Sequence, residues 1–152
     1  AESGGRLLES DAEDALRGLI LPRATVVTPN VPEARALAHV ADLDGEALAR
    51  AVYALGPAAV IVTGGHRDEA VDVVFDGRLV HELAGPRYPD GAAHGSGCTH
   101  AATLAAQLAR GATLLEAART ARQVAGEAVR DGLRSVGRGP GPVNVLGLPD
   151  TR

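Results

Sequence analysis

The chain has 152 residues, of which 45% are hydrophobic, and it carries a formal net charge of −4 with a pI near 5.7. This length is enough for one domain with a substantial core, and the acidic balance gives no general attraction for nucleic acid or for an anionic membrane. No apolar run approaches the roughly 20 residues that a membrane span needs. We therefore expect a soluble, cytoplasmic protein that binds neither nucleic acid nor membrane.

Three residue types are rare or absent. Cys98 is the single cysteine, so an internal disulfide is impossible. All 15 basic residues are arginine, so any phosphate contact must come from arginine or from backbone N–H groups. The chain contains no methionine, and we expect it to be a fragment or a processed form with a segment missing upstream.

The first third of the chain predicts a helix, a strand and a second helix. Ser10-Asp11-Ala12-Glu13 has the spacing of a capping box and predicts a helix that runs to about Leu19. The β-branched run 24–28 predicts a buried strand. Residues 31–38 predict the next helix, with proline in its first turn, where a missing N–H costs little.

The middle of the chain predicts another helix and three strands. Asp44 is a good N-cap for a helix over about 45–55, which Gly56-Pro57 ends. The apolar run 58–63 is typical of a parallel strand that is buried on both faces. The segment 71–83 predicts a β-hairpin, because Asp76-Gly77 suits the positive φ of a tight turn.

The last third predicts two helices, over about 97–110 and from the capping box at Thr113 to about Leu133, followed by an irregular tail from Gly137. This order of elements predicts an α/β fold with a mostly parallel sheet, an antiparallel edge and flanking helices. We expect residues 1–152 to belong to a single domain.

The sharpest motif is the loop of Gly95, Ser96, Gly97 and Cys98, which leads directly into an apolar helix. Glycines at a helix N-terminus let a ligand approach the backbone, and free N–H groups together with the helix dipole favour an anion such as phosphate. A thiol at such a position is favoured as the thiolate, so Cys98 is a candidate base or nucleophile. The alternative is that Cys98 is a small hydrophobic residue without a chemical role.

A second group of candidates follows the two predicted parallel strands. Asn30 and Glu33 could hold a hydrated Mg²⁺ beside a triphosphate, or could simply cap the helix that they begin. Gly64 and Gly65 could admit a nucleotide phosphate or only form a turn. Because ligands in open α/β sheets bind beyond the carboxyl ends of the strands, we expect one rim to be shared by Asn30, Glu33, Thr63, Gly64 and the Gly95 loop.

The five histidines show no metal-binding spacing, which argues against a structural zinc site. His94 and His100 flank the loop, where they could touch a ligand or could be ordinary surface or capping groups. The arginines of the last helix recur at helical spacings and predict a solvated face; they are Arg119, Arg122, Arg130 and Arg134.

Five motifs in the same order resemble one enzyme family. They are Val27-Thr28-Pro29-Asn30-Val31-Pro32-Glu33-Ala34, Val60-Ile61-Val62-Thr63-Gly64-Gly65-His66, Ala70-Val71-Asp72-Val73-Val74-Phe75-Asp76-Gly77, His94-Gly95-Ser96-Gly97-Cys98-Thr99 and Gly139-Pro140-Gly141-Pro142-Val143-Asn144. Together they resemble the C-terminal part of the hydroxymethylpyrimidine/phosphomethylpyrimidine kinases of thiamine biosynthesis, which are members of the ribokinase superfamily.

The resemblance implies a ribokinase-like fold and ATP-dependent phosphorylation of 4-amino-5-hydroxymethyl-2-methylpyrimidine and of its monophosphate. It implies that Cys98 is the base, in an anion hole formed by Gly95, Ser96 and Gly97. It also implies that Asn30 and Glu33 lie near the ATP phosphates and hold Mg²⁺ through water. A homodimer is expected on the same ground.

Two departures from the family bear on activity. Many relatives carry a lysine where this chain has Thr63, and a hydroxyl can bond a phosphate but brings no charge. The family's N-terminal part, with most of the pyrimidine pocket, has no counterpart here, so we expect the chain alone to be inactive. The alternatives are a pyridoxal or pyridoxine kinase of the same superfamily and a non-catalytic nucleotide-binding module.

Overall fold

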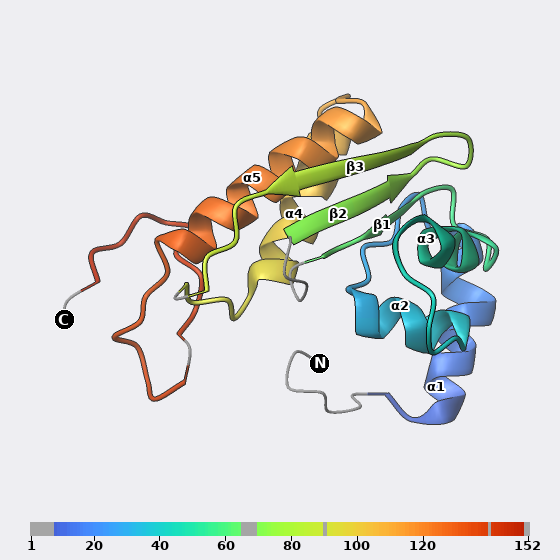
Figure 1. The fold of residues 1–152 in the computed structure, drawn as a ribbon, viewed down its shortest axis with the longest axis horizontal. Coiled ribbons are helices and arrows are strands. Elements are labelled where there is room, and N and C mark those ends of the chain that lie inside the picture. Colours follow the sequence, from blue (N-terminus) through green and yellow to red (C-terminus); the bar gives the residue numbers. More distant parts are fainter. Residues whose placement is uncertain (1–7, 65–69, 90, 140, 151–152) are drawn as a thin grey trace. The chain divides into compact units, whose positions relative to one another are not determined.

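A computed structural model describes residues 8–64, 70–89, 91–139 and 141–150, and Figure 1 shows the order of the elements. In chain order the elements are α1 (Ser10–Ala15), the π-helical turn η1 (Leu16–Ile20), the 3₁₀ turn η2 (Leu21–Arg23), α2 (Val31–Ala38), α3 (Gly45–Tyr53), β1 (Val60–Val62), β2 (Ala70–Phe75), β3 (Val80–Gly85), α4 (Ser96–Ala109) and α5 (Leu114–Arg130). The chain divides into two compact units. Unit 1 comprises Ala1–Thr63 and Val73–His81, and unit 2 comprises Gly64–Asp72 and Glu82–Arg152.

The three strands form one sheet in the order β1-β2-β3. β1 and β2 pair antiparallel, with Val60 opposite Phe75. β2 and β3 form the predicted hairpin, which is visible in Figure 1 as two adjacent arrows of opposite direction. Its turn is set by Asp76, whose Oδ1 accepts hydrogen bonds from the N–H groups of Arg78 at 2.8 Å and Leu79 at 2.7 Å. The next residue, Gly77, has the positive φ of +89° that this turn requires.

The run 24–28, which was predicted to be a strand, pairs less extensively than expected. It meets β1 through an isolated parallel bridge between Val27 and Val60, and Asn30 forms a second such bridge with Thr63. Pro29 has no N–H to donate, which shortens any ladder at this point. In the described residues the parallel part of the predicted sheet is thus limited to isolated bridges, while the continuous β1–β2 ladder is antiparallel.

The core of unit 1 is formed by one face of the sheet and by helices α2 and α3. Its buried members are Val31, Ala34, Leu48, Ala49, Val52, Val60, Val62, Val73 and Phe75. Phe75 is the only phenylalanine of the chain. The ring of Tyr53 packs edge-on against it with centroids 4.9 Å apart, and the Arg50 guanidinium lies 4.4 Å from the Phe75 centroid. These contacts give unit 1 an aromatic centre.

Helices α4 and α5 pack against each other in unit 2. The buried residues of α5 are all alanines, whose small side chains let two helices approach closely; they are Ala117, Ala118, Ala121, Ala125 and Ala128. The predicted capping box at the start of α5 is confirmed. Thr113 N–H donates to Glu116 Oε2 at 2.9 Å, and Glu116 N–H donates to Thr113 Oγ1 at 3.4 Å.

Two local predictions were wrong. The first helix is not capped by Ser10: its N-cap is Glu9, which makes no side-chain capping hydrogen bond, and Ser10 is already helical. The last helix ends at Arg130 instead of near Leu133. Across the described ranges, no helix combines the length and apolar character needed to traverse a bilayer.

Candidate functional site

The loop before α4 has the geometry of an anion site. Gly95 is the N-cap residue in the left-handed conformation, with φ of +90°, and no side chain caps the helix. Ser96 N–H donates to Ala93 O at 3.0 Å. Within the described part of the chain, no acceptor is hydrogen-bonded to the N–H groups of Gly97 or Cys98. These two amides, with the positive end of the α4 dipole, can receive an anion.

The C-terminal tail anchors this loop. His94 N–H donates to Gly141 O at 3.3 Å, and Val143 N–H donates to His94 O at 2.9 Å. The thiol of Cys98 is exposed, so it is not the small buried hydrophobic residue that was the alternative interpretation. An exposed thiol at a helix N-terminus can exchange a proton with a bound molecule.

In unit 1, Asn30 and Glu33 form a reciprocal capping box at the start of α2. Asn30 Oδ1 accepts from Glu33 N–H at 2.9 Å, and Glu33 Oε2 accepts from Asn30 N–H at 2.9 Å. The helix-capping role considered from the sequence is therefore present. Among the described residues, no hydrogen bond reaches Glu33 Oε1, and the Glu33 side chain is exposed.

The oxygen atoms of Asn30 and Glu33 suit a magnesium ion that keeps most of its water ligands better than one that is coordinated entirely by protein atoms. Nowhere in the described residues do three His, Cys, Asp or Glu side chains gather closely enough to hold a metal ion. Mg²⁺ keeps several of its water ligands and needs only one or two carboxylates. The free oxygen of Glu33 meets that requirement without breaking the capping box.

Thr63 and Gly64 follow β1. Thr63 lies beside Asn30 through their parallel bridge, and its N–H donates to Pro29 O at 2.9 Å. Gly64 is buried in unit 2, and its N–H donates to Asp72 Oδ1 at 2.9 Å. The Gly64 amide is therefore engaged in a buried structural hydrogen bond. Gly65 lies outside the described residues.

A buried charge pair that the sequence analysis missed supports the Gly64 turn. Asp72 is 3% exposed, and its Oδ1 lies 2.7 Å from Arg122 Nη1. Arg122 was predicted to lie on a solvated face of α5, and this was wrong: its side chain is only 15% exposed. A carboxylate inside the apolar run of β2 was the available signal, because a buried acid needs a cation or several donors.

His100 completes this buried cluster. Its ring is 5% exposed, and its Nε2 lies 3.7 Å from Asp72 Oδ2. Neither ring nitrogen forms a hydrogen bond within the described residues. Burial lowers the pKa of His100, the Asp72 carboxylate partly offsets that effect, and Arg122 adds to the lowering. His100 is thus neither a surface group nor a helix cap.

The structure brings the predicted site residues together in two sets. Asn30, Glu33 and Thr63 are neighbours in unit 1, whereas Gly64 and the Gly95 loop belong to unit 2. Asp72 and His100 connect the Gly64 turn to the helix that the loop begins. The single rim expected to join all of these residues stays a prediction.

Comparison with solved structures defines the class of fold. A Bacillus subtilis pyridoxal kinase in an ADP complex superimposes with a TM-score of 0.85 at 31% identity, over 93% of this chain and 57% of that one. A phosphomethylpyrimidine kinase from Clostridium difficile gives a TM-score of 0.69 at 27% identity, over 85% of this chain and 53% of that one. The chain therefore has the α/β, ribokinase-like fold of these vitamin kinases.

Sequence comparison defines the family. The profile of the phosphomethylpyrimidine kinase family matches residues 1–144. The hydroxymethylpyrimidine/phosphomethylpyrimidine kinase of Mycobacterium tuberculosis is 40% identical over 149 residues, which are 94% of this chain and 54% of that protein. The thiamine biosynthesis bifunctional protein ThiED of Geobacter sulfurreducens is 37% identical over 158 residues, covering 100% of this chain and 32% of that protein. The chain belongs to the phosphomethylpyrimidine kinase family, and it spans about half or less of the length of these relatives.

Proposed function

We propose that this chain is part of a hydroxymethylpyrimidine/phosphomethylpyrimidine kinase, a phosphotransferase of thiamine biosynthesis. Its substrates would be ATP and 4-amino-5-hydroxymethyl-2-methylpyrimidine, and then the monophosphate of that pyrimidine. The observation that carries this proposal is the exposed Cys98 thiol beside the free Gly97 and Cys98 amides, at a helix N-terminus, in a member of this family. We assign all 152 residues to a single kinase domain, with both compact units contributing to it.

The loop would act on the transferred phosphoryl group. The substrate hydroxyl oxygen forms a bond to the γ-phosphorus of ATP, the bond from that phosphorus to the β,γ-bridging oxygen breaks, and ADP leaves. Cys98 Sγ takes the hydroxyl proton as general base. The Gly97 and Cys98 amides, preset by the left-handed Gly95, stabilise the charge on the equatorial phosphoryl oxygens. Ser96 contributes by its turn with Ala93 instead of by a free amide.

Residues of unit 1 would hold the nucleotide phosphates and the metal. When bound, Mg²⁺ neutralises charge on the β- and γ-phosphates. Glu33 would hold it through water by way of Oε1, while Asn30 keeps Glu33 in place through the capping box. The hydroxyl of Thr63, next to Asn30, would donate to a phosphate oxygen where many relatives bring a lysine. Gly64 would shape the turn, and Gly65 would lie beside the phosphates.

Nucleotide binding and turnover by this chain test the proposal separately. Isothermal titration of the purified chain with Mg²⁺ and ADP should show one saturable site, and Cys98→Ala should leave that binding nearly intact. A coupled ADP-release assay with the pyrimidine substrate should show no turnover by the chain alone. Absence of any nucleotide binding would remove the nucleotide site, whereas ordinary turnover would contradict only the expected inactivity.

A pyridoxal kinase remains the second candidate, and one observation favours it. The solved structure with a TM-score of 0.85 is a pyridoxal kinase, and Staphylococcus aureus pyridoxal kinase is 31% identical to this chain with a TM-score of 0.84. Turnover of pyridoxal and of hydroxymethylpyrimidine should be compared in an active enzyme that contains this sequence. A higher kcat/KM for pyridoxal would replace the pyrimidine assignment. A longer protein that contains this sequence, binds nucleotide and supports neither reaction would instead indicate a non-catalytic nucleotide-binding module.

A further inference from the structure

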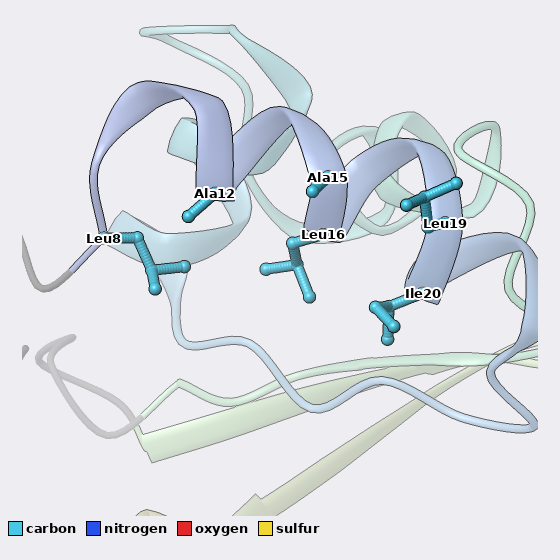
Figure 2. Close-up of a pocket in the computed structure, with 6 residues that line it drawn as sticks. All are labelled: Leu8, Ala12, Ala15, Leu16, Leu19 and Ile20. Carbon is cyan, nitrogen blue, oxygen red and sulfur yellow. The ribbon is translucent and has the colours of Figure 1, made fainter.

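Among the described residues, the buried side-chain nitrogen atoms without a hydrogen-bond partner all lie in unit 2. They are His100 Nδ1, His100 Nε2 and Arg122 Nε. The groove along α1 and η1 offers nothing comparable, because the residues that line it are leucine, isoleucine and alanine (Figure 2). Buried polar groups are normally hydrogen-bonded. Three unpartnered atoms in two side chains that share Asp72 as a neighbour therefore indicate a cluster with unused bonding capacity.

The carboxylate of Asp72 connects three segments of unit 2. Its Oδ1 accepts the N–H of Gly64 at 2.9 Å and lies 2.7 Å from Arg122 Nη1 on α5. Its Oδ2 faces His100 Nε2 on α4 across 3.7 Å, which is longer than a hydrogen bond. In the part of the chain that the structure describes, no hydrogen bond reaches Oδ2. A proton on His100 Nε2 therefore has an unused acceptor close by.

His100 is the group of this cluster whose charge changes near neutral pH. Within the described ranges, the charged groups that face its ring from other elements are Asp72 on β2 and Arg122 on α5. A guanidinium keeps its proton in proteins, so Arg122 stays positive. Burial lowers the pKa of His100, Asp72 partly offsets that effect, and Arg122 adds to the lowering. The ring is therefore neutral at pH 7 in the free protein.

The packing around Arg122 leaves the cluster little room to rearrange. A Cβ built on Gly85 of β3 would lie 2.8 Å from Arg122 Nε, so the guanidinium lies directly against the backbone of β3. A Cβ on Gly64 would clash with the carbonyl oxygen of Val71, so the turn that bonds Asp72 is confined as well. A proton on His100 would thus give a closely packed, buried site one net positive charge.

This charge would lie close to the proposed anion site. His100 belongs to α4 and follows the amides of Gly97 and Cys98 by three and two positions, which correspond to about 4.5 Å and about 3 Å along the helix axis. The helix dipole opposes a positive charge near its N-terminus. An anion bound at the two amides counteracts that opposition, because it attracts the protonated ring through a buried region where solvent screens little.

We propose that binding of a phosphate-like dianion at the Gly97 and Cys98 amides is coupled to the uptake of one proton by His100. The proton comes from solvent and leaves both ring nitrogens protonated, so that Nε2–H donates to Asp72 Oδ2. The coupling is reciprocal, so the anion is bound more tightly as the pH falls through the range in which His100 titrates. This inference rests on the anion site of the proposed function and adds its regulation, through a residue that does not touch the ligand.

Calorimetric titration of the chain with sulfate measures the coupling, because sulfate keeps its double charge over the pH range in which phosphate changes its own. Titrations at about pH 6, repeated in buffers of different ionisation enthalpy, give the number of protons taken up on binding. We expect an uptake of about half a proton or more, and an affinity at least about fivefold higher at about pH 5.5 than at about pH 7.5. NMR should show that the His100 ring titrates at higher pH when sulfate is present.

Three variants identify the group that takes up the proton. His100→Gln replaces the titrating ring by a polar side chain, so it should bind sulfate without proton uptake and lose most of the pH dependence of the affinity. His94→Gln is the matched control, because His94 is an exposed histidine next to the loop; it should keep both. Proton uptake should also persist in Cys98→Ser, which excludes the thiol as its source.

The outcomes separate this inference from the proposed function. Sulfate binding without proton uptake would overturn the coupling and leave the anion site intact. Uptake that persists in His100→Gln, or that disappears in His94→Gln or Cys98→Ser, would assign the proton to another group and overturn the coupling too. So would a His100 titration that sulfate does not shift, a measurement that needs no substitution. A chain that binds no sulfate at any pH would contradict the anion site itself and, with it, both proposals.

Discussion

Arg122 Nη1 lies 2.7 Å from Asp72 Oδ1, and the Asp72 side chain is only 4% exposed. The same carboxylate oxygen accepts the N–H of Gly64 at 2.9 Å. One buried acid therefore fixes both the turn at Gly64 and the position of helix α5 in unit 2. The stability of unit 2 depends on this acid having a charged partner.

Arg122→Met should destabilise the protein strongly. The substitution leaves Asp72 buried without its cation, and breaking a buried pair in this way costs about 3–5 kcal/mol. Urea unfolding followed by circular dichroism measures the loss. Arg119→Met on the exposed side of the same helix should change the free energy of unfolding by less than about 0.5 kcal/mol. Equal effects of the two substitutions would show that the Asp72–Arg122 pair does not stabilise unit 2.

His100 should make the protein sensitive to mild acid. Burial lowers its pKa below the usual 6.5, so the unfolded chain takes up a proton before the folded chain does. The stabilisation is complete above pH 6.5 and is lost as the pH falls from 6.5 through the lowered folded-state pKa. If the folded-state pKa is one unit below 6.5, about 1.4 kcal/mol of the free energy of unfolding is lost at low pH.

Urea unfolding at about pH 7.5 and about pH 5.5 tests this dependence on either side of the ordinary histidine pKa. His100→Leu should reduce the difference in unfolding free energy between the two pH values, because the buried titrating group is gone. The carboxylates that titrate elsewhere are the same in both proteins. An unchanged difference would mean that His100 does not titrate in this range.

Gly64→Ala should be poorly tolerated. A Cβ built on Gly64 would clash with the carbonyl oxygen of Val71, so the backbone must move to accept it. The expected cost is about 3 kcal/mol, at the upper end for an overpacked site. Gly18→Ala is the control, because its Cβ would meet no atom within 4 Å. Thermal unfolding should show a large drop in Tm for the first substitution and a neutral or slightly raised Tm for the second.

Two substitutions at Glu33 should separate helix capping from metal binding. Glu33→Gln keeps an oxygen that accepts from Asn30 N–H but removes the charge, so stability should change by less than about 0.5 kcal/mol while the Mg²⁺ dependence of nucleotide binding weakens. Glu33→Ala should lose both, with a cost near 1 kcal/mol. Calorimetric titration of nucleotide over a series of Mg²⁺ concentrations measures the first effect. An unaltered Mg²⁺ dependence in Glu33→Gln would restrict Glu33 to capping.

Cys98→Ala should lower kcat without weakening nucleotide binding, in an active enzyme that contains this sequence. Loss of a general base costs about 10²- to 10⁴-fold in rate, whereas the loop amides proposed to contact the phosphate belong to the backbone and stay in place. Steady-state kinetics gives kcat, and equilibrium titration with ADP gives the Kd. Unchanged kcat would remove Cys98 from the mechanism.

Most helices, the hairpin and the Gly95 loop could be predicted because their signals are local. The N-caps Asp44 and Thr113 and the Asp76-Gly77 turn depend only on residues a few positions away, so they can be recognised in the sequence. The strand expected over 24–28 is different, because a β-branched run forms a ladder only where the fold brings another strand alongside it, and Pro29 has no N–H to extend that ladder. In the described residues it has one neighbour, β1, and forms single bridges.

The buried cluster in unit 2 could not be read from helical spacing alone. Arg119 and Arg122 are three residues apart and suggest one solvated face, yet Arg122 follows the buried Ala118 by four positions and precedes the buried Ala125 by three. Asp72 is separated from Arg122 by fifty positions in the sequence, so only the fold pairs them. His100 likewise becomes a buried group only when α4 packs beside β2 and α5.

We expect the uncapped start of α4 to make the stability of the folded state depend on anions in solution. An anion that accepts hydrogen bonds from the N–H groups of Gly97 and Cys98 would therefore stabilise the folded state further. Inorganic phosphate, pyrophosphate or a nucleotide should then raise the melting temperature in proportion to the logarithm of its concentration. The melting temperature of this chain would then report the concentration of phosphate-bearing ligand in solution.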